Sequence, residues 1–141
     1  MEPYMHDVKY YETDKMGITH HSNYIRWMEE ARVDFMSKIG WGYDKMEEMG
    51  IISPVTAVNC QYKKSTTFND TVLIKTDVKE YKGVRIIISY EMRNLSTEEI
   101  VFTGTSEHCF LKVNGHPLRL KKDFPAFDSV LQELLQTSEN N

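Results

Sequence analysis

Four segments that follow Pro54 constrain this chain most, because each is long and rich in β-branched and aromatic residues. Only short turn-forming stretches interrupt them, such as Tyr81-Lys82-Gly83 and Asn114-Gly115. Short connections favour antiparallel pairing of consecutive strands, since parallel strands need a long crossover. The four segments are 55–62, 71–81, 84–94 and 99–113. The sequence therefore predicts an antiparallel meander.

One long helix is expected ahead of these strands. Ser22 or Asn23 can cap its N-terminus, because a side-chain oxygen there accepts hydrogen bonds from free backbone N–H groups, and Gly40 ends it. Its core-facing positions recur at three- and four-residue steps: Ile25, Trp27, Met28, Ala31, Arg32, Phe35, Met36 and Ile39. So wide an apolar face needs an element that wraps it. Strands of about ten residues, rising about 3.3 Å per residue, can form a curved sheet that does so.

The remaining segments complete an α+β architecture. We expect a strand over 4–11, a short helix over 43–49 and a C-terminal helix over 124–136, and we expect residues 137–141 to fray. A chain of 141 residues suits one hydrophobic core. The predicted organisation is a single domain over 1–141, with the helix on one face of the sheet.

Charge and composition exclude several classes of protein. The net charge of −4 offers no broad attraction for a polyanion, so nucleic-acid binding is disfavoured. No apolar run approaches the roughly 20 residues that cross a bilayer, and the first residues lack the apolar core of a signal peptide, so we expect a cytoplasmic protein. Cys60 and Cys109 lack CxxC spacing and are expected to be buried, reduced thiols. The five histidines show neither HxH nor HExxH spacing, so no metal site is predicted.

The segment from Tyr10 to Tyr24 is the most informative for function. It places Asp14, Gly17 and the pair His20-His21 directly before the expected helix. A helix N-terminus carries unpaired N–H groups and about half a positive charge, which suits an oxygen that becomes negative during acyl transfer. A neighbouring carboxylate can attack an activated carbonyl or take a proton from water. The alternative is structural, because an aspartate followed by glycine commonly does no more than cap a turn.

This segment resembles the signature of the 4-hydroxybenzoyl-CoA thioesterase and YbgC-like hotdog family. The matching positions are Tyr10, Thr13-Asp14, Gly17, Ile18, His21 and Asn23-Tyr24. The chain departs from the family at Ser65-Thr66, where Pro-Ala is usual, and at Asn69, where glycine is usual. Both departures lie in a turn and should affect local geometry more than chemistry. The resemblance implies a hotdog fold, in which a curved antiparallel sheet of about five strands wraps a long central helix.

The resemblance also implies an enzyme, an acyl-CoA thioesterase that releases a free acid and coenzyme A. Asp14 would be the nucleophile or the general base, and the sequence leaves both roles open. His21 and Tyr10 would orient the acyl group, the water or the carboxylate. Gly17 belongs to the expected substrate-binding set, together with Asn23 and Tyr24, whose backbone N–H groups would polarise the thioester carbonyl. No cofactor is expected, since coenzyme A enters as part of the substrate.

Several alternatives stay open at this stage. Arg119, Lys121 and Lys122 could hold the phosphates of coenzyme A, or they could form a solvated basic face. Glu29 on the long helix is a second candidate for the key carboxylate. The acyl group could instead be carried by acyl carrier protein, or the chain could be a non-catalytic acyl-CoA-binding module. An exposed sheet edge favours a homodimer or a homotetramer formed as a dimer of dimers.

Overall fold

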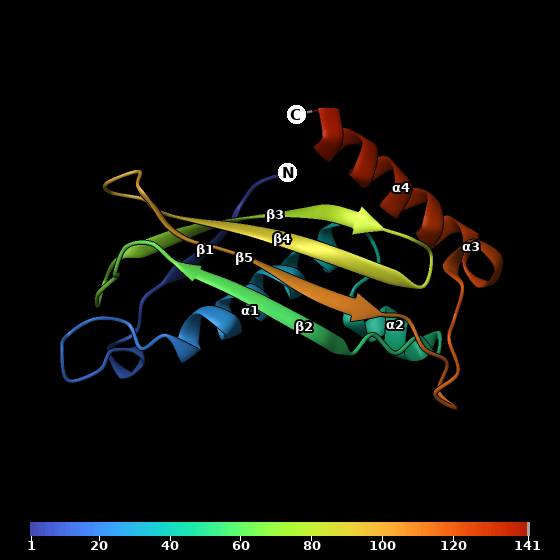
Figure 1. Ribbon diagram of the computed structural model, residues 1–141, viewed down its shortest axis with the longest axis horizontal. Coiled ribbons are helices and arrows are strands. Elements are labelled where there is room, and N and C mark those ends of the chain that lie inside the picture. Colours follow the sequence, from blue (N-terminus) through green and yellow to red (C-terminus); the bar gives the residue numbers. More distant parts are fainter. Residues whose placement is uncertain (141) are drawn as a thin grey trace.

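The computed structural model describes residues 1–140, and its central feature is a five-stranded sheet that curves around one helix (Figure 1). All neighbouring strands are antiparallel, and they lie in the order β1-β3-β4-β5-β2. The strands are β1 (Tyr4–Asp7), β2 (Val55–Tyr62), β3 (Thr71–Tyr81), β4 (Arg85–Asn94) and β5 (Ile100–Cys109). This arrangement confirms the predicted α+β fold and the antiparallel sheet. The predicted meander was right for β3, β4 and β5 but wrong for β2, which pairs with β5 at the far edge instead of with β3, the next strand in the sequence.

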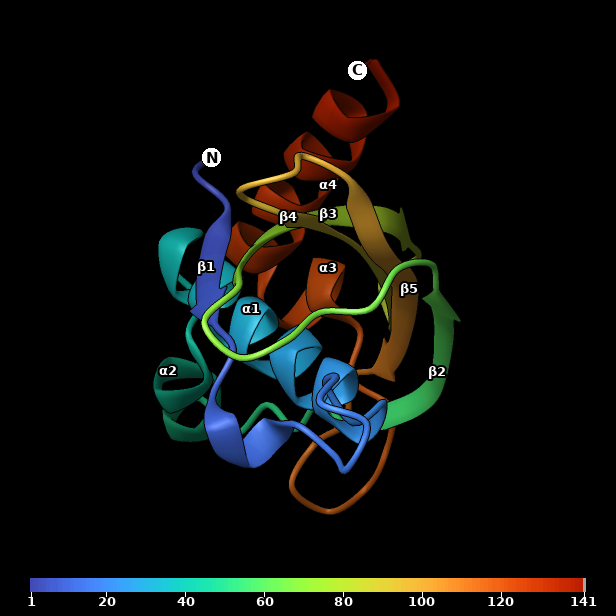
Figure 2. The same ribbon diagram turned by 90° about the vertical axis from the view of Figure 1, so that its left-hand side faces the viewer.

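Helix α1 (Ser22–Lys38) lies in the concave side of the sheet, and Figure 2 shows the strands arching over it. Its inward side chains include Trp27 and Met28, which are 0% and 1% exposed. They meet inward side chains of the strands such as Met92 and Phe102. Burial of each large apolar side chain contributes about 1.5–3 kcal/mol. The buried apolar face of α1 is narrower than predicted, because Ile25 points outward and is 45% exposed.

The C-terminal segment closes one end of the core. Helix α2 (Tyr43–Glu48) follows α1, and α3 (Leu120–Asp123) leads into α4 (Pro125–Asn140). Phe127 of α4 stacks on Trp41 with ring centroids 4.5 Å apart. Tyr81 donates a hydrogen bond of 2.5 Å to Asp128, and burial together with Asp128 raises the pKa of Tyr81 well above its usual range. These contacts fix α4 against β3.

Several predicted boundaries were wrong. Strand β1 ends at Asp7, and the residues expected to continue it form a 3-10 turn, η1 (Tyr10–Glu12). Strand β5 ends at Cys109 instead of residue 113, and Leu111 forms only isolated bridges with Ile52 and Pro117. Helix α4 continues to Asn140, four residues beyond the expected end. The expected fraying of 137–141 stays a prediction, and residue 141 lies outside the described residues.

The start of α1 also differs from the prediction. The N-cap position is His21, with no side-chain capping hydrogen bond, so neither Ser22 nor Asn23 acts as the cap. Asn23 instead donates its side-chain N–H to the carbonyl of Glu12 at 2.9 Å. The two cysteines are free, as expected, but each is only half-buried.

Candidate active site

Asp14 lies on a tight turn immediately before α1. Its backbone N–H donates to the Ile18 carbonyl, and its carbonyl accepts from the Gly17 N–H, both at 2.9 Å. Gly17 has φ of +80°, a left-handed conformation that strains residues with a Cβ. The Oδ1 atom of Asp14 accepts from the Met16 N–H at 2.9 Å. Among the described residues no hydrogen bond to Oδ2 is found, so this half-exposed carboxylate keeps one oxygen for chemistry.

Two threonines after β2 hold this turn from the other side. The Thr19 N–H donates to the Thr66 carbonyl at 2.8 Å, and the hydroxyls of Thr19 and Thr66 lie 2.6 Å apart. The Thr67 hydroxyl donates to the Gly17 carbonyl at 2.7 Å. Thr66 is 2% exposed, and its hydroxyl also lies 3.0 Å from that of Tyr24. The departure from Pro-Ala at Ser65-Thr66 therefore supplies a hydroxyl that ties the turn to α1.

The side chain of Tyr24 is structural. It is 3% exposed and stacks on Phe102 with ring centroids 5.2 Å apart. Burial raises the pKa of Tyr24, although the hydrogen bond with Thr66 acts in the opposite direction. The Tyr24 phenol therefore stays protonated near neutral pH and takes no part in proton transfer. Its buried ring supports the first turn of α1.

Glu12 is a site residue that the sequence reasoning missed. It is 5% exposed, and its carboxylate accepts hydrogen bonds from three groups: the Lys9 N–H at 2.8 Å, His6 Nε2 at 2.8 Å and Trp27 Nε1 at 2.7 Å. Burial raises the pKa of Glu12, but these hydrogen bonds outweigh burial and leave the pKa below its usual value. Its position in a polar loop gave no periodic signal, so only the fold shows that it is buried.

His21 occupies the N-cap position of α1. The exposed His21 ring stacks on His20 with centroids 4.3 Å apart, and the Tyr62 hydroxyl donates to the His21 carbonyl at 3.3 Å. Burial and the neighbouring Cys60 raise the pKa of Tyr62 to about 12, which keeps this hydroxyl protonated. Tyr62 is a second residue that the sequence reasoning missed, although an aromatic residue at a strand end was visible.

Tyr10 is 76% exposed and packs edge-on against Phe68 at 5.6 Å. Within residues 1–140, no hydrogen bond joins the Tyr10 side chain to Asp14 or His21. The structure therefore brings Asp14 and His21 to the same end of α1, but it does not place Tyr10 in contact with them.

The backbone amides expected to polarise a carbonyl are already in use. The Asn23 N–H donates to the His20 carbonyl at 3.0 Å, and the Tyr24 N–H donates to the His21 carbonyl at 3.3 Å. The Ser22 N–H faces His20 Nδ1 at 3.3 Å. In the described part of the chain no hydrogen bond from the His21 N–H is found. The amide of His21 is thus better placed to receive a substrate oxygen than those of Asn23 and Tyr24.

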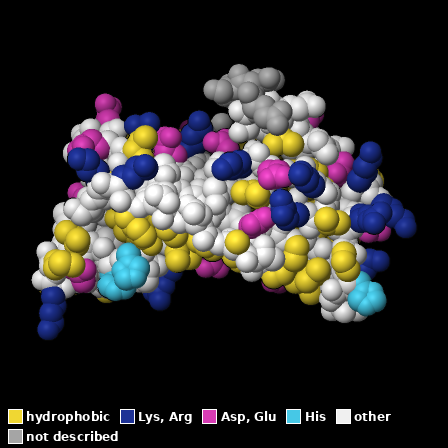
Figure 3. All heavy atoms as spheres, viewed as in Figure 1, with side chains coloured by type: hydrophobic (Ala, Val, Ile, Leu, Met, Phe, Trp, Pro, Cys, Tyr) yellow, Lys and Arg dark blue, Asp and Glu magenta, His cyan; other side chains and the backbone are white. Residues whose placement is uncertain are grey.

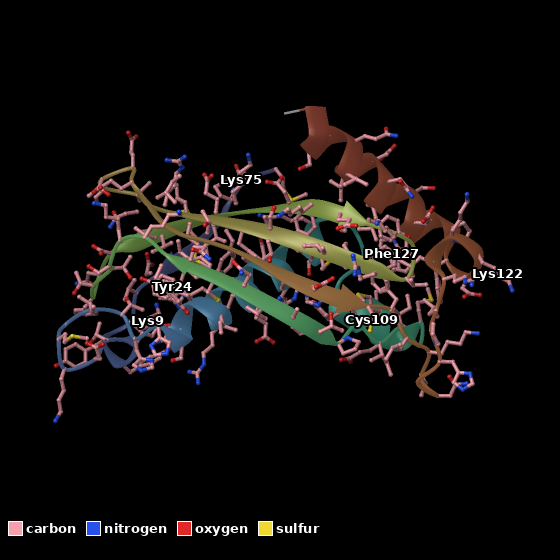
Figure 4. All side chains as sticks on the ribbon, viewed as in Figure 1. Lys9, Tyr24, Lys75, Cys109, Lys122 and Phe127 are labelled. Atoms are coloured by element: carbon pink, nitrogen blue, oxygen red, sulfur yellow. The ribbon has the colours of Figure 1, made fainter. Side chains whose placement is uncertain are left out.

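The basic cluster Arg119, Lys121 and Lys122 lies at the opposite end of the protomer from Asp14. Figure 4 shows Lys122 at one end of the molecule and Lys9 and Tyr24 toward the other. All three basic side chains are exposed. One protomer therefore does not bring this cluster to its own Asp14 turn.

Strand β2 is an unpaired sheet edge with an unusual degree of exposure. Its residues are exposed on both faces apart from the half-buried Cys60, although Val58 and Tyr62 point to the concave side. Hydrophobic side chains gather along the hollowed lower edge in Figure 3. The exposed apolar side chains of β2 are Val55, Val58 and Tyr62, and Ile52 lies just before the strand. An unpaired strand edge that carries exposed apolar side chains is typical of an interaction surface.

No group of three or more histidine, cysteine, aspartate or glutamate side chains in 1–140 could hold a metal ion. None of the helices described there is both long enough and apolar enough to cross a membrane.

Comparisons with known proteins show the family of the chain. The family model of the thioesterase-like superfamily matches residues 8–135. The chain is 32% identical to a putative acyl-CoA thioesterase, YneP, of Bacillus subtilis, over 90% of this chain and 92% of the relative. It is 27% identical to the acyl-CoA thioesterase YbgC of Haemophilus influenzae, over 62% and 65% of the two chains. A DHNA-CoA thioesterase structure from Staphylococcus aureus superposes with a TM-score of 0.90 at 38% identity, covering 99% of this chain and 93% of the other. The chain belongs to the thioesterase-like superfamily and has the hotdog fold of these enzymes.

Proposed function

We propose that this protein hydrolyses acyl-CoA thioesters and that Asp14 is the carboxylate that acts on the thioester carbonyl. The chain is a thioester hydrolase by its family, and its named relatives include acyl-CoA thioesterases. One observation supports the role of Asp14 above others. Its carboxylate stands on a hydrogen-bonded turn in the loop that leads into α1 and has Oδ2 available, and the N-cap residue of that helix, His21, has a free backbone amide.

The chemistry can follow either of two routes. As a nucleophile, Asp14 attacks the carbonyl carbon, the C–S bond breaks, coenzyme A leaves as its thiol after protonation, and water hydrolyses the resulting anhydride. As a general base, Asp14 removes a proton from a water molecule that attacks the same carbon. The C–S bond then breaks, coenzyme A leaves as its thiol after protonation, and the free acid is released directly. In both routes the carbonyl oxygen becomes negative. The His21 amide and the positive end of α1 would stabilise that charge.

We further propose a homodimer formed through β2. Antiparallel pairing of β2 with β2 of a second copy would continue the sheet and cover the apolar edge. It would also place the Val55 end of one strand beside the Tyr62 end of the other. The basic cluster of one subunit would then lie on the same side as the Asp14 turn of its partner. Arg119, Lys121 and Lys122 can in this way serve the coenzyme A phosphates of the partner's site.

A cytoplasmic location is part of the proposal. Cys60 and Cys109 are free, which suits a reducing compartment. Acyl-CoA hydrolysis needs no additional cofactor on either route, because water is the only second reactant.

The first test measures thiol release from acyl-CoAs of graded chain length, with benzoyl-CoA included. The wild type is compared with Asp14→Asn, which keeps the acceptor for the Met16 N–H, and with Glu29→Gln as the control for the rival carboxylate. We expect the wild type to hydrolyse at least one substrate, Asp14→Asn to lose about 10²-fold or more in kcat, and Glu29→Gln to stay active. Binding of acyl-CoA without hydrolysis would indicate a binding module. Full activity of Asp14→Asn would move the key role to Glu29.

A further inference from the structure

We propose that Glu12 is a positioning residue of this site, and that it sets the place of Asp14 by fastening the turn to β1 and α1. The inference rests on the proposed function, because it assigns a second acidic residue to the same site. Glu12 would never touch the substrate. It would act through the backbone of the segment that carries Asp14.

The carboxylate of Glu12 joins three parts of the chain. Its Oε1 accepts from the Lys9 N–H at the start of η1 and from His6 of β1, and its Oε2 accepts from the indole N–H of Trp27 on α1. The His6 and Trp27 rings are themselves in contact, with centroids 4.6 Å apart. Both carboxylate oxygens are therefore occupied in a buried place, which excludes Glu12 as a nucleophile.

The backbone carbonyl of Glu12 makes two more contacts. It accepts from the Asn23 side-chain N–H at 2.9 Å and from the His20 backbone N–H at 2.8 Å. The segment between Glu12 and His20 is thus closed into a loop whose two ends are hydrogen-bonded together. Asp14 is the second residue of that loop, and two residues reach at most about 7 Å. Fixing Glu12 therefore restricts where the Asp14 carboxylate can lie relative to the start of α1.

The negative charge of Glu12 is essential to this arrangement. Lys9 N–H and Trp27 N–H can only donate, so the side chain between them must accept at both oxygens. A glutamine in this place would turn its NH₂ group toward one of these two donors, whichever way its amide is oriented. Two donors that face each other in a buried site, with no acceptor for either, cost about 1–3 kcal/mol, and this cost would shift the loop.

The test compares Glu12→Gln with a matched control, Glu30→Gln. Glu30 faces the other side of the same His6 ring, with Oε2 3.3 Å from Nδ1, but it lies on the exposed part of α1. Two readouts are collected: kcat and KM for the best acyl-CoA substrate, and backbone amide exchange over 13–21 compared with β4 and β5. A displacement of about 1 Å can lower a rate by up to 10²-fold. We expect Glu12→Gln to lower kcat at least 10-fold and to change KM less than threefold. Its amide exchange should be faster only in the loop, and Glu30→Gln should match the wild type in both readouts.

A second variant separates positioning from general destabilisation. Adding Trp27→Phe to Glu12→Gln removes the indole donor, so the glutamine NH₂ can turn to that side without facing an N–H. We expect the double variant to exchange more slowly over 13–21 than Glu12→Gln alone and to recover part of kcat. Three results would each overturn the inference. Glu12→Gln could exchange its loop amides at the wild-type rate, Glu12→Gln could exchange faster throughout the sheet, or the double variant could recover neither slow loop exchange nor kcat. Amide exchange does not depend on hydrolysis. A wild type without thioesterase activity would therefore contradict the proposed function, and the exchange data would still show whether Glu12 anchors the loop.

Discussion

Arg32 on α1 donates from Nη1 to the hydroxyl of Tyr90 on β4 at 3.1 Å, in the interior of the sheet. Arg32 is 8% exposed, and within residues 1–140 no carboxylate lies within ion-pair distance of it. The Tyr90 hydroxyl lies 2.6 Å from Ser106, and Ser106 lies 2.7 Å from His108 Nε2. A guanidinium can only donate, so it favours hydroxyl protons that point along this chain toward His108. The chain Arg32–Tyr90–Ser106–His108 therefore ends on an acceptor nitrogen of a neutral imidazole.

His108 should make the stability of the protein depend on pH. Burial, together with the charge of Arg32, lowers the pKa of His108 from 6.5 to about 4. In the unfolded chain the imidazole is protonated below 6.5, whereas in the folded chain it is protonated only below about 4. The stability held by neutral His108 is therefore complete above pH 6.5 and is lost as the pH falls from 6.5 to about 4, by roughly 3 kcal/mol at 1.4 kcal/mol per pKa unit. Urea unfolding of wild type and His108→Gln at several pH values checks this, and identical pH dependence in both would contradict it.

Arg32 should set the size of that pH effect. Its charge lowers the pKa of His108, so Arg32→Met should raise that pKa toward 6.5. The loss of stability below pH 6.5 should then be smaller than in the wild type. At neutral pH the variant also avoids the cost of a buried, unpaired cation, so we expect a modest change in unfolding free energy. Lys38→Met, which removes an exposed cation from the same helix, serves as control and should keep the wild-type pH dependence.

The architecture could be predicted because it depends on periodicity. Alternation along the strands and turn residues between them indicated the hairpins of β3, β4 and β5, and the three- and four-residue spacing located α1 to within a residue. The place of β2 beside β5 could not be predicted in this way, because the two strands are distant in the sequence. The Asp14 turn was found because a carboxylate, a glycine and a helix start are close in sequence. Glu12 and Thr66 could not be found this way, since each acts on partners brought together only by the fold. Likewise, only the completed fold shows that α3 and the loop that precedes α1 lie at opposite ends of a protomer.

Phe127 should be the main anchor of the C-terminal helix. It is fully buried, stacks on Trp41 and meets Phe110 edge-on at 5.7 Å. Removal of a buried aromatic ring costs about 3–5 kcal/mol, through lost transfer energy and the cavity left behind. We expect that loss for Phe127→Ala in urea unfolding. Leu134→Ala, a partly buried position on the same helix, should cost less, and equal losses would argue against Phe127 as the anchor.

A charge on β2 should separate the subunits. Val58 lies on the concave side of the edge strand and is 42% exposed, so Val58→Lys would place an ammonium group in the proposed interface. We expect light scattering to give the monomer mass for this variant and the dimer mass, or a multiple of it, for the wild type. Ser89→Lys on β4 carries the same charge two strands from the edge and should keep the wild-type mass. Dimers of Val58→Lys would place the interface elsewhere.

Mixing two impaired variants should restore low-KM activity if the basic cluster serves the partner's site. One variant is Asp14→Asn, which has an intact cluster. The other carries Arg119→Glu, Lys121→Glu and Lys122→Glu, which keeps Asp14 but should raise KM through repulsion of the coenzyme A phosphates.

In a mixed dimer, one site combines the Asp14 of the triple variant with the intact cluster of the Asp14→Asn subunit, and its other site lacks both. If the cluster acts across the interface, co-refolded mixtures should therefore recover a low-KM activity that neither variant shows alone, close to half that of the wild type per mixed dimer. If the cluster acts on its own subunit's site, the mixture would show only the high KM of the triple variant. A triple variant with wild-type KM would assign the cluster to the solvated surface, because removing its charge would then leave substrate binding unchanged.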